Sequence, residues 1–279
     1  MKLINFKGFY HALGKKKFLE FILFSFFLFF FFGPLMNLVM LAFGDSYMYP
    51  TFIPSTFSLK WWGFVLSQKN LVGSIVLSFI VAITTTVVSM LICLPAAYAF
   101  ARYEFPLKKM FLFSFLLTNA FPKMGLYVTI GILFYKLHLM GTFAGVIIIH
   151  LINTMMYMTW IPAGAFSNVH QQQEEAARDM GASPLQTFFH VTLPMAMPGI
   201  LVAGIFTFLS SMEEAQGTLL VGVPNYKTIP VVMYSVIFDY PATAGAVFSI
   251  ILILPTIILL LLLRKSMGTN ALAKSFKMK

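Results

Sequence analysis

The chain has 279 residues, of which 59% are hydrophobic and 10% are charged; its mean hydropathy is +0.86 and its net charge +10. Soluble domains carry roughly 25% charged residues, so this composition excludes a soluble domain. The apolar residues form blocks as long as the roughly 20 residues that a helix needs to cross a bilayer core, where unpaired strand edges would find no partners. The sequence therefore predicts an all-α, multi-pass integral membrane protein.

The positive charge would also suit a nucleic-acid-binding protein, but its distribution favours a membrane protein. The lysines gather at the chain ends and in one short turn rather than on a face interleaved with aromatic residues. The single cysteine, Cys93, excludes a disulfide framework or a cysteine-based metal cluster within the chain. The first apolar run is too long for the core of a cleavable signal peptide and lacks a small-residue cleavage site.

In chain order, the predicted elements begin with a basic segment over 1–17 and end with a basic tail over 265–279. Between them we expect a single membrane domain over 18–264 with six spans. The predicted spans cover 18–43, 70–100, 110–135, 143–166, 195–212 and 242–263. Pro122 is expected to break the third span, and the longest polar stretch inside the domain is the loop over 167–194.

An even number of spans places both ends of the chain on the same side of the membrane. Assigning the ends, the turn that begins at Arg102 and the 167–194 loop to the cytoplasm puts most of the Lys and Arg residues inside. The opposite orientation would invert this bias, against the positive-inside rule. The sequence therefore predicts cytoplasmic termini and a cytoplasmic 167–194 loop.

Two short helices are predicted within this loop. The first starts near Gln171 and ends at Gly181, which suits the left-handed position after a helix. Ser183, Pro184 and Gln186 have the spacing of a capping box with proline at the first helical position, so a second helix should begin at Pro184. We expect Pro194 to end it, because the residue before a proline is pushed out of the helical region.

The spacing within this loop resembles the EAA signature of the permease subunits of binding-protein-dependent ABC importers. The signature reads Glu-Ala-Ala, three residues, Gly, nine residues, Ile, one residue, Leu-Pro. It is matched by Glu175-Ala176-Ala177, Gly181 and Val191-Thr192-Leu193-Pro194, with Val191 in place of Ile. The run from Leu94 to Arg102 before the first cytoplasmic turn also resembles the six-helix type I permeases of this family.

The resemblance implies that the 167–194 loop, called the coupling loop below, docks into a cleft of an ATP-binding subunit. Glu175 would make polar contacts in that cleft and Gly181 would supply the turn. Leu185, Phe188 and Phe189 are expected to be apolar anchors, an interpretation that depends on the predicted helix. The residues assigned to ATPase coupling are Glu174, Glu175, Ala176, Ala177, Arg178, Asp179, Gly181, Ser183, Leu185, Phe188, Leu193 and Pro194.

The chain itself is predicted to be non-catalytic. It lacks the G-x-x-x-x-G-K-[ST] segment that cradles nucleotide phosphates, and no nucleophile, general-base pair or metal cluster stands out. The resemblance implies that ATP and Mg are bound by two copies of a partner ATPase, so no cofactor is expected on this chain. It also implies a second, similar permease, in a heterodimer, an external solute-binding protein, and a place in the bacterial cytoplasmic membrane among lipid, with no nucleic acid as a partner.

Polar and ionisable residues within the spans are candidates for the solute path, because such groups are costly in lipid. The ionisable ones are Lys123, Glu213 and Glu214, of which Lys123 could instead snorkel to the interface or pair with a glutamate. The candidates without charge are Asn119, Asn153, Tyr157, Trp160 and Ser210.

The cargo is only weakly indicated. The segments 176–184, 191–194 and 228–235 resemble the polyamine branch of the family, and a carboxylate pair would attract a cation. The segment 98–106, by contrast, resembles the sugar branch, and Lys123 would suit an anion. We expect a polyamine-like organic cation, with a sugar as the alternative. An ion-coupled secondary transporter is a further alternative, although no inverted repeat is evident, and a membrane scaffold or enzyme is disfavoured because no catalytic cluster is present.

Overall fold

The computed structural model describes residues 6–48, 51 and 53–266. It divides into two compact units, one formed by Met1–Ser67 with Val236–Ile251 and the other by Gln68–Ser235 with Leu252–Lys279. The described chain is mostly helical, as the composition predicts, and the two units are described in turn.

The first unit opens with α1 (Phe6–Ala42), which is rich in phenylalanine. Residues four apart stack along it, with ring centroids of Phe26 and Phe30 6.4 Å apart and those of Phe27 and Phe31 6.0 Å apart. Phe29 is 78% exposed, which suits a lipid-facing helix that is apolar all round. The helix includes described residues of the basic segment predicted over 1–17.

Two short antiparallel strands follow α1, namely β1 (Gly44–Ser46) and β2 (Thr56–Phe57). The helix α2 (Lys60–Ser67) is attached to β1 by the indole of Trp61, which donates a hydrogen bond of 2.9 Å to the Asp45 carbonyl oxygen. The Lys60 ammonium lies 3.4 Å from the Asp45 carboxylate, and the Phe64 ring packs on Tyr240 at 4.8 Å. Trp61 and these neighbours fasten the strand to the helix.

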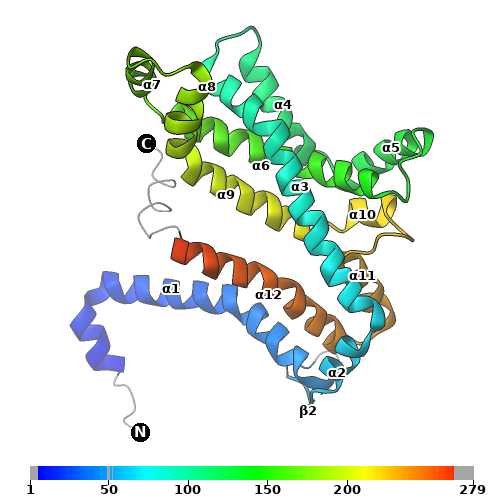
Figure 1. Ribbon diagram of the computed structural model, residues 1–279. Coiled ribbons are helices and arrows are strands. Elements are labelled where there is room, and N and C mark those ends of the chain that lie inside the picture. The colour runs from blue at the N-terminus through cyan, green and yellow to red at the C-terminus, as the bar shows by residue number, and fades with distance from the viewer. Residues whose placement is uncertain (1–5, 49–50, 52, 267–279) are drawn as a thin grey trace. The chain divides into compact units, whose positions relative to one another are not determined.

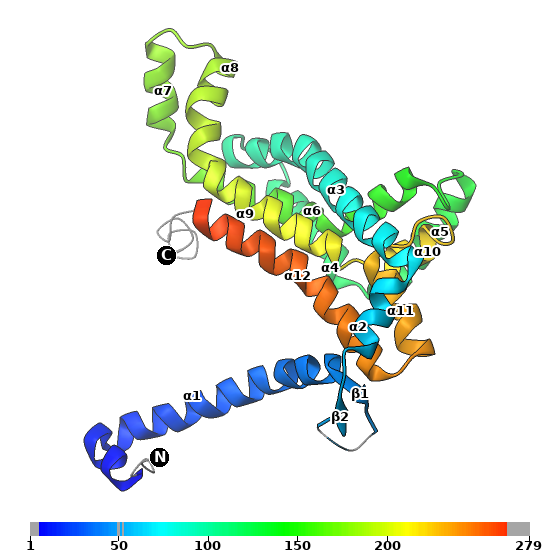
Figure 2. The ribbon, with the colours of Figure 1, turned by 60° about the horizontal axis from the view of Figure 1, so that its bottom comes forward.

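The second unit is built around α3 (Lys69–Arg102), α6 (Phe143–Ser167) and α9 (Leu193–Met212), which pack side by side (Figure 1). Small residues let the backbones approach closely: a Cβ added at Gly199 would overlap Ala165 of α6, and one added at Gly204 would lie 2.8 Å from Met90 of α3. One end of this bundle carries α7 (Gln171–Asp179) and the other carries α5 (Lys123–Lys136) and α10 (Gln216–Val221), as Figure 2 also shows.

The third predicted span is interrupted as expected. It consists of α4 (Lys108–Ala120) and α5 (Lys123–Lys136), which are bent by 102° on either side of Phe121 and Pro122. Pro122 itself is extended, at φ −58° and ψ 115°, and precedes the first residue of α5. The proline thus ends one helix and starts the next.

The prediction that Pro194 ends a short helix is wrong. From Pro184 the chain remains helical to Met212, through α8 (Pro184–Thr187), a π-helical turn η1 (Phe188–Thr192) and α9. In η1 the Leu193 N–H bonds to the Phe188 carbonyl, five residues back. This wide turn changes the carbonyl positions before Pro194, where a regular α-helix would crowd the ring and lack a donor.

The second unit also contains α10 (Gln216–Val221), the beginning of α11 (Ile229–Asp239) and, from Leu252 on, α12 (Ala242–Ser266). The range of α12 includes the last predicted span, 242–263. By length and composition, four helical segments of the described chain can cross a membrane: Lys15–Ala42, Asn70–Arg102, Phe143–Ser167 and Pro184–Met212. The bent α4–α5 pair would make five. The predicted number of six spans remains a prediction.

Candidate functional site

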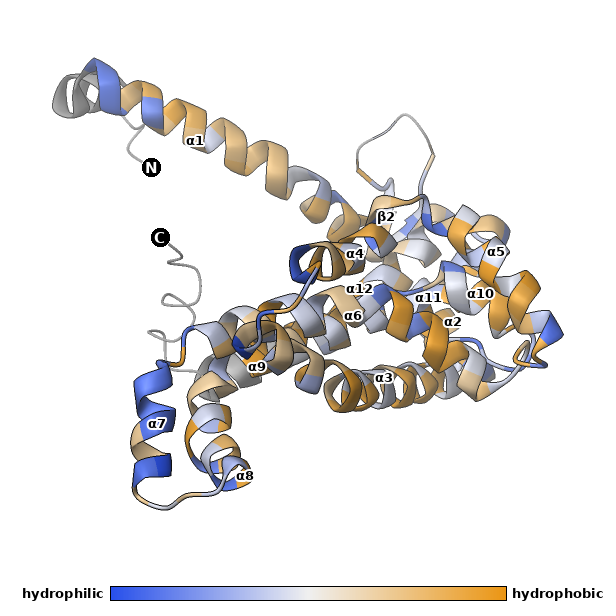
Figure 3. Ribbon diagram, turned by 90° about the horizontal axis from the view of Figure 1, so that it is seen from above, coloured by the Kyte–Doolittle hydropathy of each residue, from blue (hydrophilic) through white to orange (hydrophobic). Residues whose placement is uncertain are grey.

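The coupling loop forms a polar projection at one end of the second unit. Figure 3 shows α7 mostly in the hydrophilic colour, whereas α3 is mostly in the hydrophobic colour. Along α7, Glu174 and Ala177 are buried while Glu175, Arg178 and Asp179 are exposed. Because residues three apart share a face of a helix, α7 has an inner face that contacts the unit and an outer face that is open.

The end of α7 has the geometry predicted for Gly181. The Gly181 N–H bonds to the Arg178 carbonyl at 2.8 Å and the Ala182 N–H to the Ala177 carbonyl at 3.1 Å. These are the two hydrogen bonds of a Schellman motif, with Gly181 at φ +93°. Glycine adopts this left-handed conformation without the steric strain that a Cβ would introduce.

The start of α8 is the predicted capping box. The Gln186 N–H bonds to the Ser183 hydroxyl at 3.3 Å, and the Ser183 N–H bonds to the Gln186 side-chain oxygen at 2.8 Å. Pro184 occupies the first turn, where its missing N–H costs no hydrogen bond. The elbow between α7 and α8 is therefore fixed by local hydrogen bonds on both sides.

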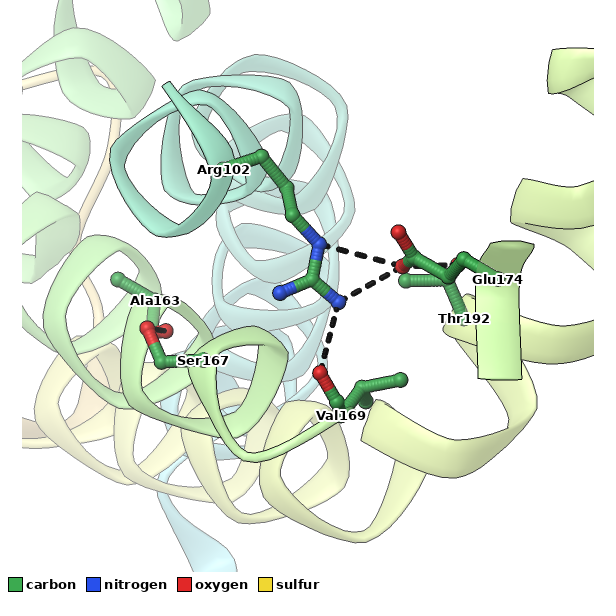
Figure 4. A network of polar contacts seen from close by, with 6 residues as sticks. All are labelled: Arg102, Ala163, Ser167, Val169, Glu174 and Thr192. Atoms are coloured by element: carbon green, nitrogen blue, oxygen red, sulfur yellow. Dashed lines mark hydrogen bonds and ion pairs between the residues drawn. The ribbon is translucent and has the colours of Figure 1, made fainter. Parts of the chain in front are cut away.

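A buried ion pair fastens the inner face of α7 to the bundle. The Arg102 guanidinium, at the last residue of α3, lies 2.7 Å from the Glu174 carboxylate, and the two side chains are 8% and 6% exposed. The same carboxylate oxygen accepts a 2.7 Å hydrogen bond from the Thr192 hydroxyl in η1. Arg102 also donates to the Val169 carbonyl after α6, at 3.0 Å (Figure 4). The network therefore joins α3, α7, η1 and the start of the coupling loop.

An aromatic cluster lies beside this network. Tyr98 packs edge-on against Phe166 at 5.5 Å and against Phe188 at 5.2 Å, and the Arg102 guanidinium lies 6.0 Å from the Tyr98 ring. Phe188 comes from η1 and Phe166 from the end of α6. Two of the elements that the polar network joins, α3 and η1, are thus also packed through their rings, together with the end of α6.

The outer side of the elbow is open. Met180 is 84% exposed, Leu185 71% and Phe189 57%. Glu175, earlier on α7, is exposed as well. Glu175, Gln172 and Arg102 contribute to an open hollow of about 520 Å³ between α7 and the ends of α3 and α6. This combination of apolar and charged groups can engage a protein partner through both packing and ionic contacts.

The structure divides the residues assigned to ATPase coupling into two groups. The exposed group comprises Glu175, Ala176, Arg178, Asp179, Gly181, Ser183, Leu185 and Pro194, whereas the partly or fully buried group comprises Glu174, Ala177, Phe188 and Leu193. Phe188 was predicted to be an apolar anchor alongside Leu185 and Phe189, but here it packs inside the protein. Leu185 and Phe189 are free to contact a partner.

Two acids predicted for the solute path have different surroundings. The Glu214 side chain is buried, and its two oxygens accept hydrogen bonds from the Tyr127 hydroxyl at 2.9 Å and the Gly217 N–H at 2.8 Å. It thereby ties α5 to the first turn of α10. Glu213, at the end of α9, is exposed. The carboxylate pair expected from the sequence is therefore one structural acid and one open acid.

Three of the uncharged candidates come together. The Asn153 amide of α6 donates to the Ser210 hydroxyl of α9 at 3.0 Å, and the Asn119 amide of α4 lies 3.5 Å from the Asn153 carbonyl. The ring of Tyr157, one turn along α6, stacks on Phe206 at 5.8 Å. These groups form a continuous polar and aromatic strip across α4, α6 and α9.

Trp160 and Lys123 make none of these contacts. The Trp160 indole donates to the Leu112 carbonyl at 2.9 Å, so it braces α6 against α4. Lys123, the first residue of α5, is half-buried and makes no ion pair within the described part of the chain. The hypothesis that it pairs with a glutamate therefore has no support among the described residues.

The sequence interpretation missed the polar partners of these groups. Arg102 was seen only as part of a basic turn and of the resemblance, and His150 was not singled out. His150 is fully buried, with its ring nitrogens 2.7 Å from the Ser211 hydroxyl and 2.8 Å from that of Thr218. The available signal was a histidine in an apolar run, which requires hydrogen-bond partners when it is buried.

No metal site accompanies these networks in the part of the chain that the structure describes, since no group of three His, Cys, Asp or Glu side chains lies close enough to hold an ion. The polar groups instead bond to one another across helices. Their hydrogen bonds hold neighbouring helices in position.

Comparison with known proteins gives a family match along most of the chain. Residues 5–269 match the family model described as binding-protein-dependent transport system inner membrane component. A protein of Pyrococcus horikoshii, named a probable ABC transporter permease protein, is 40% identical over 47% of this chain, and the match spans about half of that relative's length, 48%.

Two longer matches are less identical. The trehalose transport system permease protein SugB of Mycobacterium tuberculosis is 26% identical over 76% of this chain and 80% of its own. The putrescine transport system permease protein PotI of Escherichia coli is 26% identical over 74% of this chain and 75% of its own.

The fold is similar to a solved crystal structure of a bacterial ABC transporter involved in the import of the acidic polysaccharide alginate. The TM-score is 0.69, with 96% of this chain and 100% of that chain covered, at 17% identity. At this identity the similarity concerns the fold alone.

Proposed function

Because the chain belongs to the family of binding-protein-dependent transport system inner membrane components, we propose that it is half of the membrane path of an ATP-driven importer. A solute-binding protein delivers the solute from outside, and ATPase subunits dock on the outer face of α7 and the elbow after it. Closure of the ATPases moves the coupling loop, and the path opens to the other side of the membrane. Differential contact of the ATPases with the two states drives the switch.

The observation that carries this proposal is the geometry of the coupling loop. A helix stopped by a Schellman motif and a second helix started by a capping box hold an elbow whose outer side exposes Glu175 and Leu185. The elbow is stiffened on its inner side by the Arg102–Glu174 ion pair. A stiff exposed elbow suits a mechanical contact with another subunit.

We also propose which subunits the chain assembles with and which membrane holds it. Two ATPase subunits would bind ATP and Mg, so this chain needs no cofactor and catalyses no reaction itself. A second, similar permease would complete the path in a heterodimer in the bacterial cytoplasmic membrane. Family membership supports ATPase and solute-binding partners in general, and the copy numbers are our proposal.

A purification tests the function. The chain is expressed together with ATPase, permease and binding-protein subunits from its source organism and purified through a tag on this chain. We expect the ATPase subunits to co-elute, and ATP hydrolysis in liposomes to rise when binding protein and solute are added together. Co-elution without any response of ATP hydrolysis to binding protein would contradict the proposed function.

For the cargo we propose a small organic cation, on the strength of Glu213. This carboxylate is exposed at the end of α9, in the same unit as the polar strip of Asn119, Asn153 and Ser210. Glu214 beside it is committed to Tyr127 and Gly217, so Glu213 supplies the open charge. The putrescine permease among the relatives is consistent with a cationic solute.

A sugar is the second candidate, favoured by the polar strip itself. Amide and hydroxyl groups from Asn153 and Ser210, with the ring of Tyr157 one turn away, are the groups that bind uncharged polyols. The trehalose permease among the relatives is consistent with this alternative.

The variant Glu213→Gln distinguishes the two candidates in uptake assays with putrescine and trehalose as probes. If the cargo is a cation, the KM for putrescine should rise about fivefold, since an exposed ionic contact contributes up to about 1 kcal/mol. If it is a sugar, trehalose should be taken up with the same KM by parent and variant. Putrescine uptake that is unaffected by the substitution would remove the electrostatic argument.

A further inference from the structure

We propose that the Arg102–Glu174 ion pair is the latch through which movement of the coupling loop reaches α3 and α9. The latch consists of Arg102, Glu174 and Thr192. The inference depends on the proposed function and deepens it, because it assigns these three side chains as positioning residues that transmit motion. None of them needs to touch the ATPase.

The hydrogen bonds of the latch all meet at one oxygen atom of Glu174. Glu174 Oε1 accepts hydrogen bonds from Arg102 Nη2 at 2.7 Å, Arg102 Nε at 3.2 Å and Thr192 Oγ1 at 2.7 Å. Arg102 ends α3, and Thr192 is the last residue of η1, directly before α9. A single carboxylate oxygen on α7 is therefore held at once by groups that lead into two of the three core helices.

Neighbouring acids on α7 have opposite surroundings. Glu174 is buried with Ala177 on the inner face, whereas Glu175 is exposed beside that face and lines the open hollow together with Arg102. A partner that docks on Glu175 thus pushes on a helix whose other side is attached to the bundle. The outer acid makes the contact, and the inner acid transmits it.

The latch resists separation more than an exposed ion pair would. Its side chains are 8% and 6% exposed, so pulling α7 away would leave a guanidinium and a carboxylate unpaired in a site with little water. The Tyr98 ring packs against both Arg102 and Phe188, and this packing holds the end of α3 and η1 in a fixed position relative to each other. Displacement of α7 therefore moves Arg102 and Thr192 with it instead of breaking the contact.

The test separates transmission from folding by removing both charges together. In Arg102→Met with Glu174→Met, apolar side chains of similar length replace a buried pair, a change that folded proteins tolerate well. In liposomes containing the complete importer, we expect the solute transported per ATP hydrolysed to fall by about tenfold or more, the size of a typical coupling between sites. The probe is putrescine or trehalose, whichever the parent transports.

Two further variants keep the test decisive. Glu104→Gln with Lys108→Gln removes an exposed pair of 2.8 Å from the turn after α3, and this matched control should keep the parent ratio. Thr192→Val removes one hydrogen bond to Glu174 at constant shape and should lower the ratio severalfold. It decides the question if the double methionine variant does not assemble.

The outcomes distinguish the latch from the proposed function. A parent complex without solute-dependent ATP hydrolysis would overturn both. A working parent with an unchanged ratio in the assembled double methionine variant would overturn the latch alone and make the ion pair a static brace. If that variant does not assemble, an unchanged ratio in Thr192→Val leads to the same conclusion.

Discussion

Replacing Glu174 alone by alanine is expected to lower the free energy of unfolding by about 3–5 kcal/mol, because one partner of a buried ion pair is removed. The Arg102 guanidinium, 8% exposed, would lose the carboxylate 2.7 Å away and keep only the Val169 carbonyl. Thr192 would lose its hydrogen-bond acceptor as well. Denaturant unfolding of the purified chain in mild detergent, followed by tryptophan fluorescence, measures the change.

Glu175→Ala is the matched control for this loss. It removes the same charge from the next position of the same helix, where the side chain is exposed. Substitutions at such sites usually change stability by no more than about 0.5 kcal/mol. Equal losses of stability in the two variants would contradict the assignment of Glu174 as the buried anchor. Glu175→Ala should instead weaken retention of the ATPase subunits during purification.

Gly181→Val is expected to reduce transport by about tenfold while leaving the membrane helices folded. Gly181 has φ +93°, a conformation that costs a residue with a Cβ about 1–2 kcal/mol and a β-branched residue more. No atom lies within 4 Å of the position that a Cβ would take, so the effect comes from the backbone and not from a clash. The elbow would relax toward a negative φ and turn α7 relative to α8.

Gly181→Asn is the control here, because asparagine tolerates the left-handed region better than other residues with a Cβ. We expect it to retain most of the transport activity in the same liposome assay. Helix content from circular dichroism should be the same for the parent and both variants. Full transport by Gly181→Val would show that the shape of the elbow does not control coupling.

The local geometry of the coupling loop could be predicted from the sequence, because each signal there is short-range. Gly181, Ser183 and Gln186 determine their hydrogen bonds within a few residues, and all of these bonds have the expected pattern. The bend at Pro122 is predictable for the same reason, since a proline lacks its N–H wherever the chain goes.

Contacts between distant elements could not be predicted in this way. Glu174 and Glu175 have the same chemistry, and only the position of Arg102, 72 residues away, decides which of them is buried. Likewise, the sequence shows two adjacent acids, Glu213 and Glu214. Only the structure shows that the hydroxyl of Tyr127 on α5 donates a hydrogen bond to the Glu214 carboxylate. The sequence shows the two acids without their partners, so it gives no sign that one of them is held inside the protein.

The continuous helix from Pro184 to Met212 could not be predicted from proline rules alone. These rules describe regular α-helices, in which Pro194 would be a stop. The π-turn over Phe188–Thr192 accommodates the proline, and the sequence carries no short-range signal that indicates such a turn. The error concerned the helix end and left the start at Pro184 unaffected.

This π-turn also sets the direction in which the elbow faces. One additional residue in the winding rotates everything before it by about 100° relative to a regular α-helix. Leu185, which precedes the turn, therefore points in a direction offset by this angle from the one that a regular α-helix continuous with α9 would give it. Inserting or deleting one residue within 188–192 would rotate the exposed surface of the elbow about the helix axis. The side chains of α9 would keep their neighbours.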